Sequence, residues 1–172
     1  MNDSPTRLGK GMILIAWLLV LGLLTLFFND FHDKQNNPNQ ELTTQTNQDG
    51  TREVRLQRNR SGHYVASGTI NGKSVVFFLD TGATMVSIPE RVANRLNLQR
   101  GIPISVSTAN GTITTYATRL DNIALGAIKL HKVRASINPY SPDDKILLGM
   151  SFLKDLEFTQ RGDILILRQY SK

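Results

Sequence analysis

The chain has 172 residues, and its 20 lysines and arginines exceed its 14 acidic residues, so the formal charge is +6. With 40% hydrophobic and 20% charged residues it has the composition of a globular protein, and its length suits one ordinary domain. It contains no cysteine, which excludes disulfide bonds, zinc ribbons, iron–sulfur clusters and cysteine nucleophiles. The three histidines (His32, His63 and His131) are far apart in the sequence, so we expect no metal site and no other cofactor.

An uncharged, strongly apolar segment occupies residues 11–28. As a helix it would span about 27 Å, close to the thickness of the hydrocarbon core of a bilayer. A cleavable signal peptide is the alternative. Its apolar region is usually shorter and ends at small residues, whereas this segment ends in Leu26-Phe27-Phe28. The segment is therefore predicted to be an uncleaved transmembrane anchor.

The charges that flank this segment predict its orientation. Arg7 and Lys10 precede it, and Asp30 and Asp33 follow it. Because positive residues stay on the cytoplasmic side, residues 1–10 are expected in the cytoplasm and the rest outside. In a bacterium with two membranes this describes a single-pass protein of the inner membrane whose main domain is periplasmic.

Beyond the anchor, the composition changes at about residue 50. Residues 29–50 are rich in Asn and Gln and show no apolar periodicity, which predicts a polar, flexible tether. Residues 51–172 form the predicted domain. Its basic residues are spread along the chain without interleaved aromatic residues, so no nucleic-acid partner is expected.

The first half of this domain is patterned as strands around one short helix. A strand over 63–70 is followed by an Asn71-Gly72 hairpin turn and by an apolar strand over 74–79, which should be buried on both faces. That strand ends at Asp80-Thr81-Gly82-Ala83. A short helix then follows a capping box at Ser87–Glu90 and stops at Asn97.

The second half is also mainly strand-like. Strands are predicted over 102–108, 112–118, 119–124 and 129–137, with a second hairpin turn at Asn110-Gly111. After a loop over 138–144 come a buried strand over 145–149, a short helix over 150–158 and a last strand over 163–169. No strand–helix alternation indicates a parallel sheet. The apolar run 164–167 fits either a dimer interface or a central strand of the protomer.

Asp80 is the residue most indicative of function. A carboxylate directly after a buried strand lies at the mouth of a buried element, which is a common setting for a catalytic acid. Thr81 can form hydrogen bonds across the loop, and Gly82 allows a backbone N–H to approach the carboxylate. An Asp that merely opens a turn is the alternative interpretation.

The surrounding residues resemble a known family. Phe78-Leu79-Asp80-Thr81-Gly82-Ala83 is similar to the active-site loop of retropepsin-like aspartic proteases. The Asn110-Gly111 hairpin lies where that family has its flap, and Ile146-Leu147-Leu148-Gly149 before Met150 resembles its hydrophobic-hydrophobic-Gly element and the following helix. More narrowly, the chain resembles the bacterial membrane-anchored members. One departure is Thr84, where the viral enzymes usually have Asp, so the viral type of ion pairing at the dimer base is not expected.

This resemblance implies a mainly β, retropepsin-like closed β-barrel protomer with one or two short helices, preceded by the transmembrane helix. It also implies an aspartic endopeptidase. Two carboxylates must share one proton in such an enzyme, and the chain has one Asp-Thr-Gly, so a homodimer would supply Asp80 twice. The substrate is expected to be a peptide or protein. The implied site consists of catalytic Asp80, the loop residues Thr81, Gly82 and Ala83, and the flap or substrate-binding residues Asn110, Gly111, Ile113, Leu148 and Gly149.

Other classes fit the sequence less well. Asp80-Thr81-Gly82-Ala83-Thr84 also resembles a phosphate loop of actin-like ATPases, but the domain is too short for their two lobes and has no Walker motif. Gly149-Met150-Ser151 is not followed by the second glycine of a serine-hydrolase motif. A catalytically silent, membrane-anchored dimer of the same fold that only binds peptides stays open as the alternative. A purely structural envelope protein is a third interpretation.

Overall fold

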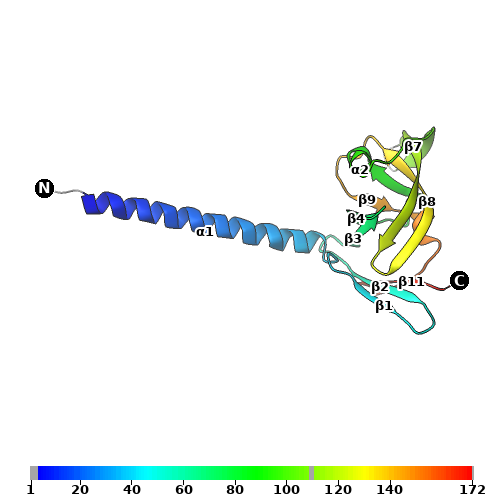
Figure 1. Cartoon of the computed structure of the whole chain (residues 1–172), viewed down its shortest axis with the longest axis horizontal. Coiled ribbons are helices and arrows are strands. Elements are labelled where there is room, and N and C mark those ends of the chain that lie inside the picture. Colours follow the sequence, from blue (N-terminus) through cyan, green and yellow to red (C-terminus); the bar gives the residue numbers. More distant parts are fainter. Residues whose placement is uncertain (1–3, 109–110, 172) are drawn as a thin grey trace. The chain divides into compact units, whose positions relative to one another are not determined.

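A computed structural model describes residues 4–108 and 111–171 of the chain, shown in Figure 1. The chain divides into two compact units, Met1–Gln35 and Asn36–Lys172. The first unit is formed by helix α1 (Ser4–Asn36), and the second contains all the strands.

Helix α1 includes the predicted anchor and extends beyond it at both ends. Within its segment Gly9–Asn36, the most apolar window of 18 residues has a mean hydropathy of 2.6, and none of that window is buried. By length and composition it can cross a membrane, although a signal sequence would have the same properties. An ion pair between Lys34 and Asp30, one helical turn apart, lies on the polar extension that follows the apolar stretch.

The larger sheet of the second unit has seven strands. They are β3 (Val65–Ile70), β4 (Lys73–Leu79), β9 (Ile146–Leu148), β5 (Val86–Pro89), β8 (Ile128–Asn138), β7 (Gly111–Leu125) and β6 (Pro103–Thr108), in that spatial order. An additional pairing of β3 with β7 closes the sheet on itself. This arrangement confirms a mainly β, closed fold.

Two features of this sheet differ from the sequence prediction. Strand β4 pairs with β9 in parallel, and so does β5 with β8. The sequence predicts no parallel pairs, because its strands and helices do not alternate. The connection from β5 to β8 runs through a short helix, β6 and β7, and the connection from β4 to β9 contains all of these and also β5 and β8, so neither is a single helical crossover. The predicted strands 112–118 and 119–124 are one continuous strand, β7, because it pairs with β8 along most of its length. Figure 1 shows β7 and β8 as one long hairpin.

A second sheet has four strands in the order β1 (Thr43–Thr46), β2 (Arg52–Gln57), β11 (Ile164–Gln169) and β10 (Glu157–Arg161). Strand β11 therefore lies between two neighbours and is an interior strand of the protomer. The predicted helix over 150–158 is shorter than expected, because α3 (Met150–Leu153) ends early and the chain enters β10.

The segment predicted to be a flexible tether is partly folded. Asn39 is 4% exposed and its side chain donates hydrogen bonds to the carbonyl oxygens of Gln57 and Val65, at 2.8 and 2.7 Å. Its Oδ1 accepts a hydrogen bond from the Gln57 N–H at 2.6 Å. Residues 43–46 then form β1 against β2. Polar residues can join a fold in this way because their backbone and amide groups satisfy other backbone groups.

The helix between β5 and β6 begins later than its capping-box pattern suggests. Helix α2 spans Glu90–Leu96 with Pro89 as its N-cap and no side-chain cap. Ser87 instead continues strand β5, where it lies opposite Ser136 and Leu147. The predicted stop is confirmed, since Asn97 has a left-handed backbone with φ of 58°. The Asn71-Gly72 turn is also confirmed, with φ of 49° and 79°.

Candidate active site

Asp80 is positioned by a pair of parallel strands. It directly follows β4, whose last residue Leu79 lies opposite Leu148, the last residue of β9. The Asp80 N–H donates a hydrogen bond to the Leu148 carbonyl at 3.3 Å. The side chain of Asp80 is half-buried at this point. The carboxylate thus lies where β4 and β9 end together. Strand β4 is buried on one face only, through Val75 and Phe77, and not on both faces as its apolar run predicts.

The loop that follows Asp80 orients its carboxylate through the backbone. The Gly82 N–H donates to Asp80 Oδ1 at 2.9 Å, and the Ala83 N–H lies 3.3 Å from the Asp80 carbonyl oxygen. A Cβ added to Gly82 would lie only 3.2 Å from Oδ1, so a side chain here would crowd the carboxylate. The predicted roles of Gly82 and of the loop backbone in holding Asp80 agree with this geometry. Thr81 is exposed beside them.

Gly149 lies directly beneath this loop. A Cβ at this position would lie 2.5 Å from the Ala83 carbonyl oxygen and would also meet the Met85 carbonyl oxygen. The next two residues hold the loop, since the Met150 N–H donates to the Ala83 carbonyl at 2.8 Å and the Ser151 N–H donates to the Thr84 carbonyl at 3.0 Å. The structure therefore brings Gly149 to the Asp80 loop as a packing element.

Leu148 also lies beside the loop, but its side chain does not face a groove. It is 0% exposed and belongs to the hydrophobic core, together with Ile146 and Phe152. What Leu148 offers the site is its carbonyl oxygen, which accepts the Asp80 N–H. Through this hydrogen bond Leu148 positions the Asp80 loop.

Sequence reasoning did not assign a role to Ser151. Its Oγ accepts a hydrogen bond from the buried Val86 N–H at 2.9 Å and donates one to the Arg134 carbonyl at 2.7 Å. This side chain therefore ties α3 to β5 and β8 directly behind the Asp80 loop. The available signal was a small polar residue two positions after the glycine, in the first turn of the helix.

The predicted flap corresponds to the hairpin of β6 and β7. Thr108 lies opposite Gly111, whose φ is 109°, and Ile113 is half-buried opposite Val106. Asn110 lies outside the described residues. Among the described contacts none joins Gly111 or Ile113 to Asp80, so their flap role stays a prediction.

A pocket of about 380 Å³ borders the Asp80 loop on another side. It is mainly apolar and is lined by Tyr64, Leu79, Thr81, Leu153, Phe158, Gln160, Leu165 and Leu167. Thr81 is thus shared by the loop and the pocket. The sequence analysis did not identify this pocket, because its walls come from strands β4, β10 and β11 and from α3, which are far apart in the chain.

The site offers one type of chemistry directly. Asp80 presents a carboxylate that is oriented by the backbone N–H of Gly82 and is not fully buried, so it can accept a proton from a water molecule. Within residues 4–108 and 111–171, no cluster of three or more His, Asp or Glu side chains is arranged as metal ligands.

Comparison with known proteins agrees with this geometry. Residues 66–155 match the model of the family described as gag-polyprotein putative aspartyl protease, a range that includes the Asp80 loop and Gly149. The chain is also 32% identical over 180 residues to an uncharacterized protein in the cobV 5′ region of a Sinorhizobium species, covering 96% of this chain and 77% of that protein.

Two solved structures resemble the fold. A retropepsin-like aspartic protease from Rickettsia conorii superposes with a TM-score of 0.57 at 22% identity, covering 75% of this chain and 95% of that one. The EIAV protease complexed with the inhibitor HBY-793 has a TM-score of 0.45 at 22% identity, covering 56% of this chain and 90% of that one. From the matched residues and the likeness of the fold, the chain belongs to the gag-polyprotein putative aspartyl protease family and has a retropepsin-like fold.

Proposed function

We propose that this protein is an aspartic endopeptidase that hydrolyses peptide bonds as a homodimer. The observation that carries the proposal is the carboxylate of Asp80, which directly follows strand β4 and is oriented by the Gly82 N–H at 2.9 Å. Family membership supports the same chemistry, because the matched range contains this loop.

The homodimer follows from the number of carboxylates that the reaction needs. One carboxylate must accept a proton from water, while a second, protonated one donates to the carbonyl oxygen of the substrate. The sequence has one Asp-Thr-Gly, at Asp80. A two-fold symmetric pair of protomers would place both Asp80 loops against each other and complete the site.

In this mechanism the ionised Asp80 takes a proton from a water molecule, and the oxygen of that water attacks the carbonyl carbon of the peptide bond. The protonated Asp80 of the other protomer gives its proton to the carbonyl oxygen, which yields a neutral tetrahedral intermediate. When the C–N bond breaks, the first Asp80, now protonated, gives its proton to the leaving nitrogen, and the second, now ionised, takes the proton of one hydroxyl group as the carbonyl re-forms. The two Asp80 residues end with their original single shared proton.

The proposed substrate is an extended peptide of a protein, bound between Asp80 and the β6–β7 hairpin. Gly111 and Ile113, with Asn110, would cover the peptide as a flap. The half-buried Ile113 supports an apolar contact with the substrate. Backbone groups of the hairpin can pair with an extended chain, which is a common mode of peptide recognition.

The proposed location is a membrane, with α1 as a single-pass anchor. By the distribution of flanking charge, the N-terminus would be cytoplasmic and the protease domain periplasmic in a bacterium with two membranes. Two protomers anchored in one membrane have a raised effective concentration, which would favour the dimer.

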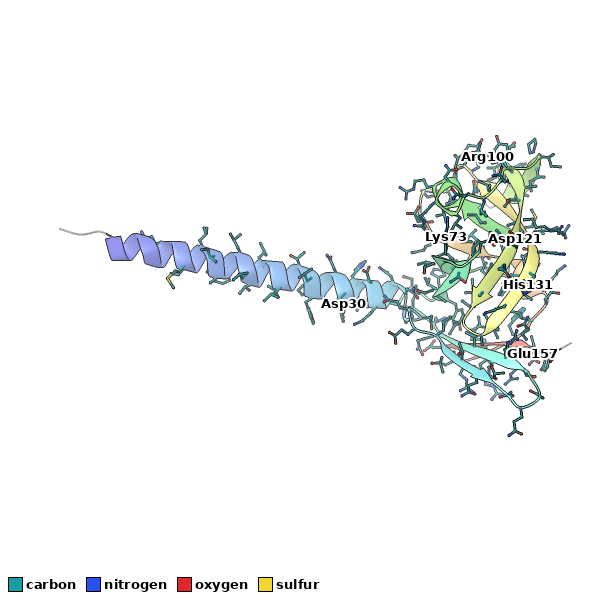
Figure 2. The ribbon with its side chains drawn as sticks, viewed as in Figure 1. Asp30, Lys73, Arg100, Asp121, His131 and Glu157 are labelled. Carbon is teal, nitrogen blue, oxygen red and sulfur yellow. The ribbon has the colours of Figure 1, made fainter. Side chains whose placement is uncertain are left out.

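The test uses the full chain in detergent micelles, incubated with a mixed peptide library. Asp80→Asn should abolish cleavage while leaving the fold intact. The matched control is Asp121→Asn, since Asp121 is an exposed residue of β7 outside the Asp80 loop and is labelled in Figure 2. Wild-type activity should rise faster than linearly with protein concentration. A folded, dimeric wild type that binds peptides without cutting them would contradict the proposal and favour the silent peptide-binding dimer.

A further inference from the structure

The folded domain begins directly at the end of α1. The side chain of Asn59 donates a hydrogen bond to the Asn36 carbonyl oxygen at 3.1 Å. The side chain of Asn37 donates one to Ser67 Oγ at 3.1 Å, and the Ser67 N–H donates to the Asn39 carbonyl oxygen at the same distance. The chain is therefore fixed to the domain from residue 36 onwards.

This attachment leaves only a short link between the apolar segment and the domain. The apolar segment ends at Phe28, and residues 29–36 continue α1 as a polar extension. We refer to residues 29–36 as the link. As a helix the link spans about 12 Å, and fully extended it would span no more than about 28 Å. The ion pair between Lys34 and Asp30, which is labelled in Figure 2, favours the helical form.

The short link limits the distance between Asp80 and the membrane. A folded unit of the size of Asn36–Lys172 has a radius of gyration of about 14 Å, which corresponds to a diameter of about 35–40 Å. Whatever the orientation of the domain, Asp80 then lies within about 50 Å of the hydrocarbon core as long as the link is helical. The β6–β7 hairpin belongs to the same unit, so the whole proposed peptide-binding site has this limit.

The part of the domain to which the link is attached is basic. Asn59, which holds the Asn36 carbonyl, lies between Arg58 and Arg60 in the sequence, and both arginines are exposed. Arg58 also pairs with Asp163 at 3.4 Å, an exposed and therefore weak ion pair. Anionic lipid headgroups attract exposed basic residues that lie close to the membrane surface. The charge at this point therefore favours a domain that stays at the membrane.

We propose that the substrates of this protein are membrane-proximal segments of other proteins anchored in the same membrane. The inference rests on the proposed function, which supplies both the protease and the anchor. An extended segment that leaves the membrane beside the protease meets Asp80 at a high effective concentration, because both chains are confined to one surface. A peptide bond that a rigid structure holds well beyond about 50 Å from the hydrocarbon core stays out of reach.

The first experiment offers two reporter proteins to the full chain in vesicles of phosphatidylethanolamine and phosphatidylglycerol. Both reporters carry a transmembrane helix and the same cleavable sequence, taken from a library peptide that the full chain cuts. In the near reporter this sequence directly follows the helix. In the far reporter a helical spacer of about 80 residues separates the two by about 120 Å. The near reporter should be cut at least tenfold faster.

A variant with a longer link should lose this preference. An insertion of about 80 flexible Gly and Ser residues between Gln35 and Asn36 adds about 50 Å of average reach and leaves Asn36 attached to Asn59. Cleavage of the far reporter should increase several-fold. The matched control carries the same residues after Lys172, where they add mass without lengthening the link, and it should cut both reporters like the wild type. All three proteins should cut the soluble library peptide at the same rate.

A second measurement does not depend on activity. Because the chain has no cysteine, Ser61→Cys introduces a single thiol at an exposed position of the loop that Asn59 organises. A fluorophore on this thiol should transfer energy efficiently to acceptors on the lipid headgroups. In the variant with the inserted residues the transfer should fall at least twofold. Both proteins would carry Asp80→Asn, so that cleavage cannot change them during the measurement.

The outcomes separate this inference from the proposed function. Equal cleavage of the near and far reporters by the full chain would overturn the inference. So would an inserted link that brings no gain on the far reporter, or equal energy transfer with and without the insertion. In each of these cases cleavage of the soluble peptide that depends on Asp80 would still support the protease. A full chain that cuts neither the reporters nor any soluble peptide would contradict the proposed function and this inference together.

Discussion

The α-carbon of Gly149 lies so close to the Ala83 carbonyl that a Cβ on Gly149 would be 2.5 Å from that oxygen. The Ala83 carbonyl is at the same time held by the Met150 N–H at 2.8 Å, so it cannot move away without losing a hydrogen bond. This contact couples the end of β9 to the loop that orients Asp80.

Gly149→Ala is therefore expected to displace the Asp80 loop. The overpacking should lower the free energy of unfolding by about 1–3 kcal/mol and should reduce peptide cleavage strongly. Thermal unfolding and cleavage rates of the full chain would measure both effects. Gly72→Ala is the control. An added Cβ at Gly72 would meet nothing within 4 Å, so the backbone φ of 79° is the only strain on the alanine. If Gly149→Ala cleaves peptides like the wild type, the loop does not depend on this contact.

Ser151→Ala should loosen the same loop from behind. It leaves the Val86 N–H and the Arg134 carbonyl without the hydroxyl that now joins them, at 2.9 and 2.7 Å. Because Val86 is 0% exposed, the unpaired N–H should lower the free energy of unfolding by about 1–3 kcal/mol. Ser105→Ala, at an exposed position of β6, should change the stability little. Equal stability of the two variants would contradict this role for Ser151.

Asn39 is expected to contribute to stability although it lies outside the matched family range. Asn39→Ala removes three hydrogen bonds between the side-chain amide and the backbone of Gln57 and Val65. Because Asn39 is 4% exposed, water cannot readily take the place of the lost amide. The loss should be about 2 kcal/mol or more in the free energy of unfolding. Asn47→Ala, whose side chain is exposed, is the control. An Asn39→Ala variant as stable as the wild type would show that the amide is dispensable.

The same observation predicts where a soluble fragment should begin. A fragment of residues 51–172 lacks both Asn39 and β1, whereas a fragment of residues 36–172 retains the whole second unit. The longer fragment should unfold at a higher temperature and resist proteolysis longer. Equal melting temperatures would contradict the view that residues 36–50 are part of the fold.

Glu53 should make stability depend on pH at the acidic end. Hydrogen bonds from Arg168 and Arg55, each 2.8 Å from a carboxylate oxygen, hold the pKa of Glu53 below its usual value of 4.5. Because the pKa is lower in the folded state than in the unfolded one, the ionised carboxylate stabilises the fold. That contribution is complete above the unfolded pKa and is lost as the pH falls through the lowered folded value.

The free energy of unfolding should thus decrease as the pH falls below about 4.5, where the unfolded side chain titrates. Glu53→Gln should remove part of this decrease, because the amide does not titrate. Denaturant unfolding at several pH values, for the wild type and the variant, would measure the difference. Asp121→Gln would control for the removal of an acidic group at an exposed site. Parallel pH profiles for the wild type and Glu53→Gln would exclude this contribution.

Much of the local structure could be predicted from the sequence. The β3–β4 hairpin, the stop of α2 at Asn97 and the carboxylate at the end of β4 each depend on residues within a few positions of one another. Apolar alternation and Asn-Gly turns act over that short range, so they are readable without the fold. The resemblance that identified the family rested on the same short segments, around Asp80 and Gly149.

Other local predictions failed where distant residues competed. Ser87 has the spacing of a helix cap, but pairing with β8 and β9 keeps it in β5. The helix after Gly149 has an apolar pattern that continues beyond Leu153, yet Phe158 pairs with Leu167 and becomes part of a strand. In both cases a strand partner contributed by another part of the chain outweighed a weak helical preference.

By itself, the sequence determined the apolar helix, the order of most strands and the carboxylate that we propose to be catalytic, because these follow from side chains close together in the chain. Only the tertiary structure decided that Asn39 is buried, that Ser151 ties three elements together behind Asp80, and that β11 is an interior strand while Phe158 is left at an edge. Each of these depends on a contact between residues that are distant in the sequence. The residues next to a side chain in the sequence do not indicate which distant backbone group or strand it will contact.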